Sequence, residues 1–200
     1  MKFIIEVAGE KHCQFAEQIC KEMEESAKIR GTGIAKRSPE YVKTKICEGK
    51  AVIALDEGYD FAGFSYIESW SHNSFVANSG LIVNPKYRRS GLARQIKKII
   101  FELSRKKFPN AKIFSITTSL AVMKLNSEIG YKPVTFSELT DDEEFWKGCE
   151  DCVNRDILHR NNRRMCLCTG MLYDPSKTEK FNFIKKFNVL ERFRRLFTVK

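Results

Sequence analysis

The stretch from Leu81 to Ile99 contains the residues whose types and spacing best support chemistry. It begins as an apolar strand, turns at Pro85, and enters a helix through a segment that contains Gly91. A helix that begins in this way leaves several backbone N–H groups unpaired and close together, and the helix dipole adds partial positive charge. Such donors suit a phosphate or pyrophosphate. Arg88 and Arg89 add positive charge where the anion would arrive.

The helix after this turn is predicted to be amphipathic, because apolar residues recur on one side at helical spacing. Basic residues fall largely on the other side. The apolar set is Ile96, Ile99, Ile100 and Leu103, and the basic set is Arg94, Lys97, Lys98 and Arg105.

The pattern Arg88-x-x-Gly91-x-Ala93 resembles the acyl-CoA signature of the GNAT superfamily of acyltransferases, which reads Arg/Gln-x-x-Gly-x-Gly/Ala. The context agrees with this resemblance. An apolar strand precedes the pattern, a long helix follows it, a second apolar strand spans residues 113–118, and a helix ends at Gly130-Tyr131. The resemblance covers residues 1–140.

The resemblance implies direct transfer of an acyl group from acetyl-CoA, or another acyl-CoA, to an amine, without a covalent enzyme intermediate. It also implies that Leu81 and Val83, on either side of Ile82, offer main-chain hydrogen bonds to the pantetheine arm. The pyrophosphate would lie on the backbone of Arg88, Arg89, Ser90, Gly91, Leu92 and Ala93. A side chain at Gly91 would obstruct the phosphate.

The acid for the departing thiolate is where this sequence departs from the family. Many members carry Leu-Tyr-x-x-x-Gly-Phe, whereas here Asn126 follows Leu125. Asn donates a hydrogen bond but supplies no proton. A water or Ser127 would replace the Tyr, or the thiolate would leave unprotonated, and Asn126 would otherwise be a solvated amide on the helix surface.

A base for the incoming ammonium is the second requirement. Some members carry a Glu on the strand before the phosphate loop, and the segment Val76 to Gly80 has none. Glu68 and His72, at the end of the neighbouring strand, are the nearest ionisable candidates, although a His beside a turn is usually a surface residue. Arg30, Lys36 and Arg37 would receive a carboxylate of the acceptor, or are ordinary solvated charges.

Four of the seven cysteines form two closely spaced pairs, Cys149-x-x-Cys152 and Cys166-x-Cys168. A two-residue gap lets a turn bring two thiolates to one metal, and alternate strand positions point to one face. The four would close a structural zinc site. The alternatives are buried free thiols, or a redox pair at Cys149 and Cys152. An odd number of cysteines excludes a fully paired disulfide framework within one chain.

Composition suits one globular domain, since the 200 residues are 42% hydrophobic and 30% charged. No apolar run is long enough to cross a membrane, and the first residues show no signal peptide, so a cytoplasmic protein is expected. The net charge of +10 admits nucleic acid, an anionic membrane or a polyanionic ligand as partner.

Much of the positive charge lies in residues 176–200, where basic residues alternate with Phe, Ile and Leu. This pattern predicts a basic amphipathic helix or tail. Such a helix binds an anionic membrane or RNA, or docks on the body or on a second subunit, and we favour docking. No recognisable nucleic-acid module is present, so no specific nucleic-acid partner is expected. A homodimer is compatible with the sequence.

The order of predicted elements matches the topology of the superfamily. Strands are expected at 3–8, 51–55, 61–70, 75–83, 113–118, 131–136 and 164–173, and helices at 11–28, 38–48, 92–108 and 120–129. A helical segment is expected from residue 140, within a Cys-containing insertion over 140–170. The fold class is therefore α+β with α/β/α layers, a mostly antiparallel mixed sheet and a C-terminal extension, and residues 1–175 form the acyltransferase domain.

The function expected from the sequence is transfer of an acetyl or short acyl group from acyl-CoA to a primary amine of a small molecule. Residues 136–175 also resemble a bacterial subgroup linked to arginine biosynthesis, which implies glutamate or a related amino acid as acceptor. The alternatives are a non-catalytic CoA-binding regulatory module, and a basic protein associated with nucleic acid or membrane.

Overall fold

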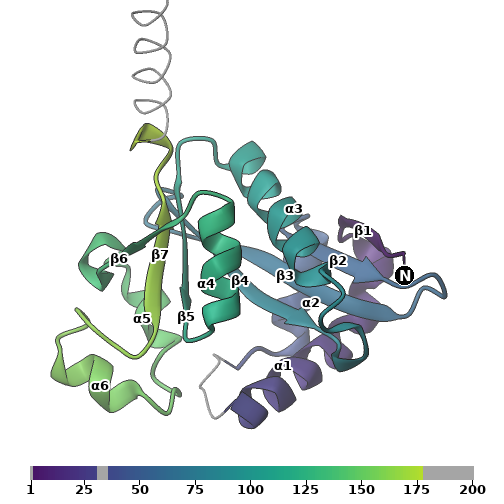
Figure 1. The fold of residues 1–200 in the computed structure, drawn as a ribbon, viewed down its shortest axis with the longest axis horizontal. Helices are drawn as coiled ribbons and strands as arrows, with labels where there is room; N and C mark the ends of the chain where they lie inside the picture. Colours follow the sequence, from purple (N-terminus) through teal and green to yellow (C-terminus); the bar gives the residue numbers. More distant parts are fainter. Residues whose placement is uncertain (1, 31–35, 178–200) are drawn as a thin grey trace, which may run out of the picture.

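The structure is a computed structural model and describes residues 2–30 and 36–177. These residues form a seven-stranded sheet with the order β1-β2-β3-β4-β5-β7-β6 (Figure 1). The strands are β1 (Ile4–Val7), β2 (Ala51–Leu55), β3 (Phe61–Trp70), β4 (Phe75–Val83), β5 (Lys112–Thr117), β6 (Lys132–Val134) and β7 (Thr169–Tyr173). The helices are α1 (Ala16–Arg30), α2 (Pro39–Cys47), α3 (Leu92–Lys107), α4 (Leu120–Glu128), α5 (Glu143–Lys147) and α6 (Arg155–Arg160).

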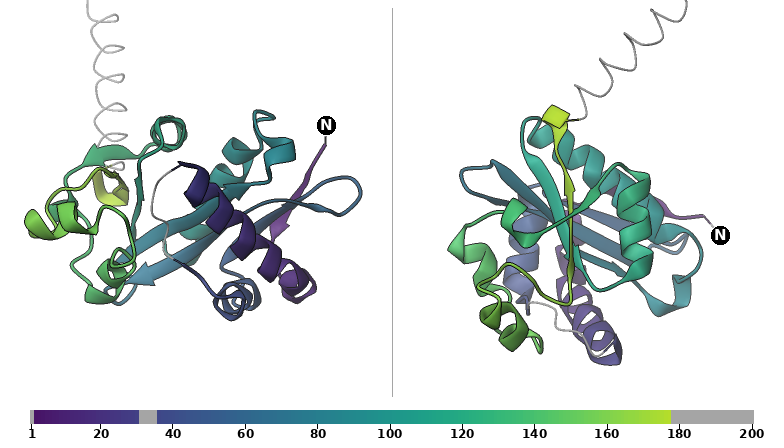
Figure 2. Two further views of the ribbon diagram at one scale, coloured as in Figure 1. Left: turned by 90° about the horizontal axis from the view of Figure 1, so that it is seen from below. Right: turned by 60° about the vertical axis from the view of Figure 1, so that its left-hand side comes forward.

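All neighbouring strands are antiparallel except β4 and β5, which are parallel. Helices α1 and α2 cover one face of the sheet, and α3 and α4 cover the other (Figures 1 and 2). Successive side chains of a strand point to opposite faces, so β3 contributes side chains to the core on each face of the sheet. Phe64 belongs to the core beneath α1 and α2, and Ile67 to the core beneath α3. The α+β layered architecture predicted from the sequence is confirmed.

Helix starts follow local capping rules. The Ser38 hydroxyl accepts a hydrogen bond from the Tyr41 N–H, with Pro39 as the first residue of α2, as the sequence predicted. Ser119 caps α4 in the same way, by accepting from the Val122 N–H. These caps fix the points at which α2, after α1, and α4, after β5, begin.

The extension between β6 and β7 packs on the side of the sheet that carries Ala77 and Phe114. Trp146 of α5 and Leu158 of α6 are buried there, in one core cluster with both residues. This packing extends the face covered by α1 and α2 beyond β4, toward β5 and β7.

The strand predicted over 164–173 was too long, because β7 begins only at Thr169. Met165 and Leu167, which fall within the predicted strand, are 61% and 63% exposed. The turn after α6 places Asn162 and Arg163 at positive φ, and α6 itself was not predicted.

Among the helices of the described residues, none combines the length and apolar character needed to cross a membrane. From residue 178 onward, the predicted basic tail lies outside the described residues. The tail and the proposed domain boundary at residue 175 stay predictions.

Candidate functional site

The two parallel strands at the centre of the sheet separate along their length. Pairing joins Phe75–Ala77 of β4 to Lys112–Phe114 of β5 and stops there. Beyond that point, the next residues of both strands line a cavity of about 720 Å³. The lining includes Asn78 to Leu81 from β4 and Ser115 to Thr117 from β5. The cavity therefore lies in a gap of the sheet, open to side chains from both faces.

A β-bulge in β4 shapes this gap. The register between β3 and β4 shifts opposite Ser65, whose hydroxyl donates to the Ser79 carbonyl at 2.9 Å. Gly80 has φ +61°, and a Cβ there would lie 2.3 Å from Tyr66 Cε1 and 2.8 Å from Met23 Cε. Only glycine fits this position, because both the backbone conformation and the space exclude a side chain.

At the far end of β4, the turn into α3 presents a row of free backbone donors. Within the described part of the chain, no acceptor takes the N–H groups of residues 89–93. Arg89 (φ 65°) and Gly91 (φ 81°) both adopt the left-handed conformation, which turns successive amides toward one concave site. A Cβ at Gly91 would meet nothing within 4 Å, so the space in front of the amides is open. The Ser90 hydroxyl donates to the Tyr87 carbonyl and leaves the amides uncapped.

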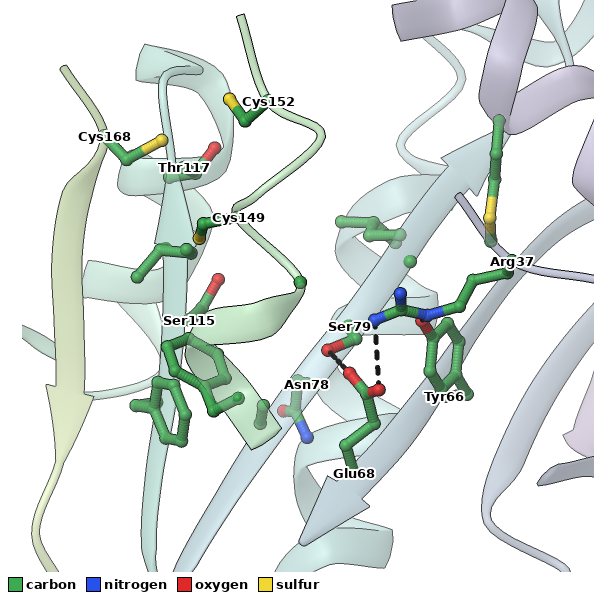
Figure 3. Close-up of a pocket in the computed structure, with 18 of the residues that line it drawn as sticks. Arg37, Tyr66, Glu68, Asn78, Ser79, Ser115, Thr117, Cys149, Cys152 and Cys168 are labelled. Atoms are coloured by element: carbon green, nitrogen blue, oxygen red, sulfur yellow. Dashed lines mark hydrogen bonds and ion pairs between the residues drawn. The ribbon is translucent and has the colours of Figure 1, made fainter. Parts of the chain in front are cut away.

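On the face covered by α1 and α2, the cavity ends at a buried carboxylate. Glu68 is 4% exposed and accepts three hydrogen bonds. The donors are Arg37 Nη2 at 3.1 Å, the Tyr41 hydroxyl at 2.5 Å and the Ser79 hydroxyl at 2.5 Å. Figure 3 marks the bonds from Arg37 and Ser79. Burial, and then the Glu68 charge, raise the pKa of the Tyr41 phenol, so this phenol stays a donor.

Arg37 links this carboxylate to the aromatic wall of the cavity. Its Nε donates to the Tyr66 hydroxyl at 2.9 Å, and its guanidinium carbon lies 5.1 Å from the centre of the Tyr41 ring. Burial raises the pKa of Tyr66 as well. We name Arg37, Tyr41, Tyr66, Glu68 and Ser79 the Glu68 cluster. It is a rigid polar surface that keeps both of its charges paired.

On the opposite face of the sheet, Lys97 of α3 lines the same cavity. It is 2% exposed, and its Nζ lies 5.1 Å from the centre of the Tyr131 ring. In residues 2–30 and 36–177, no carboxylate lies within ion-pair distance of this ammonium. Burial lowers the pKa of Lys97 from 10.5 to about 7.

The sequence had placed Lys97 with the basic residues opposite the apolar side of the helix. That assignment was wrong for Lys97. Both β4 and α4 pack on α3, so more of the helix surface is buried than the apolar residues on one side predict. Ser104, one heptad further along, is also fully buried. Phe101 and Ser104, at i+4 and i+7 from Lys97, are the sequence signal that a second buried stripe exists.

No protein-family model matches the sequence, and no curated protein matches it. Solved structures do match. N-acetylglutamate synthase from Neisseria gonorrhoeae, complexed with coenzyme A and N-acetyl-glutamate, aligns with TM-score 0.61 and 17% identity over 87% of this chain. The aligned part is 35% of the synthase, so this chain spans about a third of that protein.

Two further structures are matched over most of their own length. A phosphinothricin acetyltransferase of the GNAT superfamily from Sinorhizobium meliloti, in complex with AcCoA, has TM-score 0.59 and 14% identity over 87% of this chain and 89% of its own. A GNAT-family acetyltransferase from Staphylococcus aureus has TM-score 0.58 and 12% identity, over 70% of this chain and 91% of its own. The chain has the GNAT fold. Identities this low show the fold and leave activity to be argued from the site.

The remaining candidates for proton transfer in this GNAT fold fall in different places. Of the two proposed bases, Glu68 lies at the cavity, whereas His72 lies exposed in the β3–β4 turn with φ 53° and does not line it. Asn126 is fully buried on α4, and neither atom of its amide has a partner in the described residues. It is therefore no solvated surface amide, although it does not line the cavity.

The zinc site predicted at the four C-terminal cysteines finds no support in the described residues, although all four line one small pocket. In residues 2–30 and 36–177, no three His, Cys, Asp or Glu side chains are grouped as metal ligands. Cys166 and Cys168 lie before β7 rather than on it, so strand alternation does not align them. Burial, and then the neighbouring cysteines, raise the pKa of Cys149 to about 11 and that of Cys168 to about 12. The structure supports partly buried free thiols.

Proposed function

We propose that this chain transfers an acetyl or another short acyl group from acyl-CoA to the primary amine of a small molecule. The observation that carries the proposal is the gap between β4 and β5. The cavity in this gap reaches Leu81 of β4 and the buried carboxylate of Glu68, and a row of free amides lies further along the chain at the start of α3. Donor and acceptor would therefore approach one cavity from opposite sides.

The donor would bind mainly through backbone groups. Its diphosphate would accept from the amides of residues 89–93, with Arg88 and Arg89 nearby as exposed cations. Its pantetheine arm would lie along β4 at Leu81, Ile82 and Val83. That edge of β4 has no partner on β5, and an amide-containing arm hydrogen-bonds there as an added strand does.

The acceptor amine would arrive at the Glu68 cluster. Glu68 Oε1 already accepts from Arg37 and Tyr41, whereas within residues 2–30 and 36–177 Oε2 accepts from Ser79 alone. Oε2 therefore keeps a lone pair for the ammonium or for a water that carries its proton away. In this assignment Glu68 is the base.

The lining of the cavity suits an acceptor that carries its own carboxylate. Lys36 and Arg37 lie on one wall, and Lys147 of α5 lies on the wall formed by the extension. Glutamate or a related amino acid is our candidate, supported by the likeness to a synthase crystallised with N-acetyl-glutamate. The lining is of mixed charge, because Glu144, which pairs with Lys147, and Asp151 also lie there. The basic side chains would bind the carboxylate of the acceptor.

A second candidate is a CoA-binding module without activity. Asn126 in place of the family's Tyr favours it, because Asn supplies no proton. The three hydrogen bonds on Glu68 favour it as well, since a carboxylate held in this way is a weaker acceptor.

Release of free thiol from acetyl-CoA, with a panel of amino acids and polyamines, tests the proposal. An acyltransferase gives acceptor-dependent release that Glu68→Gln abolishes. The binding module gives heat release on calorimetric titration with CoA and no thiol release with any acceptor, which would contradict the proposed activity.

A further inference from the structure

Lys97 is a buried cation with no counter-charge among residues 2–30 and 36–177. Its ammonium faces the Tyr131 ring, and the Tyr131 hydroxyl is already committed to Asn78 Oδ1 at 2.9 Å. Asn78 Nδ2 in turn donates to the Ser104 hydroxyl at 2.7 Å. The neighbouring polar groups thus hydrogen-bond to one another, and Lys97 lines the cavity.

A side chain of this kind is costly to keep. Burial of an ammonium without an anion is unfavourable, and an apolar side chain of similar length would pack with less penalty. Buried titratable groups with perturbed charge cluster at functional sites for this reason. The ammonium therefore suggests a role in the cavity rather than in the core.

The position of Lys97 along the donor path follows from two elements. Arg88 Nε lies 3.5 Å from the Val83 carbonyl, so the phosphate loop adjoins the end of β4. Asn78, which Tyr131 links to Lys97, is five residues earlier on that strand, or about 16 Å away at about 3.3 Å per residue. An arm that runs from the loop along β4 would bring its far end, with the thioester, to the level of Lys97.

We propose that Lys97 is the acid of the reaction, and that its ammonium gives a proton to the sulfur of CoA as the thiolate departs. This inference rests on the proposed function. It also gives the cavity the proton donor that Asn126 does not supply.

The step balances as follows. The nitrogen of the neutral amine attacks the thioester carbon, the C–N bond forms, and the C–S bond breaks with its electron pair on sulfur. The proton lost by the amine goes to Glu68 or to water, and the proton on Lys97 Nζ goes to sulfur. Lys97 is then neutral and regains a proton from solvent after the CoA thiol leaves. The sum is acyl-CoA plus amine giving amide plus CoA thiol.

The surroundings of Lys97 contain few charges that compete with this role. Helix α3 packs against β2, β3, β4 and α4, and neither β2 nor β4 carries a titratable side chain. The titratable side chains on the remaining elements are Tyr66 and Glu68 on β3, Lys124 and Glu128 on α4, and Tyr131 after it. Glu68 lies on the opposite face of the sheet, and Glu128 is exposed and paired with Arg94. Burial alone lowers the pKa of Lys97 to about 7, where it is readily protonated and readily gives the proton away.

The test compares Lys97→Met and Lys97→Gln with the matched control Lys98→Met, since Lys98 is exposed on the same turn of α3. Each full-length protein is assayed for acetyl-CoA affinity and for turnover across the neutral and alkaline range. Loss of the acid is expected to lower kcat about 100-fold while the affinity for CoA stays near the wild-type value. The wild type should lose activity on the alkaline side as Lys97 deprotonates, and both Lys97 variants should lack this alkaline limb.

A second readout needs no turnover. The thiol of bound CoA is titrated through the ultraviolet absorbance of its thiolate, and its pKa should be lower in the wild type than in Lys97→Met, because an adjacent ammonium favours the thiolate. Lys97 variants with wild-type kcat, an unchanged alkaline limb or an unchanged thiol pKa would overturn the inference and leave the proposed function intact. A wild type that binds no CoA would overturn both.

Discussion

Glu68 and Lys97 are two buried charges that line one cavity from opposite faces of the sheet, and they differ in the partners that surround them. Both are nearly inaccessible, at 4% and 2% exposure. Glu68 accepts from a guanidinium, a phenol and a hydroxyl, whereas the contact that the described residues give the Lys97 ammonium is the Tyr131 ring. The difference matches the two proposed roles. Glu68, held by three donors, is the proposed base, and Lys97, with no carboxylate partner in the described part of the chain, is the proposed acid.

The largest expected effect comes from replacing Glu68, the charge that has partners. Glu68→Gln removes the counter-charge of Arg37 and the proposed base, so kcat/KM for acyl transfer should fall by about 100-fold or more. The free energy of unfolding should also fall, by about 1–3 kcal/mol, because the Arg37 charge stays buried without its partner. Turnover assays and urea unfolding measure the two effects. Glu57→Gln, in the exposed β2–β3 turn, is the control, and equal behaviour of the two variants would contradict the account.

Replacement of Lys97, the unpaired charge, should change the free energy of unfolding in the opposite direction. Lys97→Met removes a buried ammonium and should raise the free energy of unfolding by an amount on the order of 1–3 kcal/mol near neutral pH. Because the folded-state pKa of Lys97 (about 7) lies below its ordinary value of 10.5, the unfolded chain binds more protons between these values. The contribution of Lys97 to the free energy of unfolding of the wild type therefore rises as the pH increases from about 7 to 10.5. The stability advantage of Lys97→Met over the wild type should become smaller over the same pH range.

Denaturant unfolding of both proteins at neutral and at alkaline pH checks this prediction. A Lys97→Met protein that is less stable than the wild type at neutral pH would show that the ammonium is a structural contact. The comparison with Glu68 would then lose its basis.

The phosphate loop gives a smaller effect that is independent of both charges. Gly91→Ala places a Cβ at φ 81°, which costs about 1–2 kcal/mol in the left-handed conformation, and it also crowds the open face of the amides. Affinity for CoA should fall about 10-fold, as measured by calorimetry. Gly9→Ala is the control, because Gly9 also has free space around its Cβ position and has φ −137°. Loss of affinity in the control as well would argue against a specific role of the loop.

The smallest effect is expected within the Glu68 cluster. Tyr41→Phe removes one donor to Glu68 and leaves Arg37 and Ser79 in place, so the loss should be about 1 kcal/mol in stability and several-fold in kcat/KM. Thermal unfolding and turnover assays measure it. A loss as large as that of Glu68→Gln would mean that the phenol itself takes part in the reaction.

Local patterns in the sequence predicted most of the fold. Apolar runs bounded by turns located β2, β3 and β4 with the boundaries that the structure shows, and Ser38 before Pro39 located the start of α2. The Gly91 turn was also visible, because a left-handed helix start needs a glycine-like conformation. These features depend on neighbouring residues, which the sequence contains.

The chemistry of the cavity depends on contacts between distant segments and was predicted only in part. Glu68 was a candidate, but its donors Arg37 and Ser79 come from 31 residues before it and 11 residues after it. Lys97 was assigned to the basic side of α3 because a single helix does not reveal that both β4 and α4 cover it. The cysteine spacing suggested zinc, and only the path of the chain before β7 shows that Cys166 and Cys168 are not aligned on a strand.

The most direct test of the central claim follows the backbone amides of residues 89–93 by NMR on ¹⁵N-labelled protein during titration with CoA. The account predicts large shifts of these resonances with CoA and small ones with pantetheine, which has the same arm but lacks the diphosphate. Unchanged resonances at saturating CoA, or equal shifts with both compounds, would contradict it.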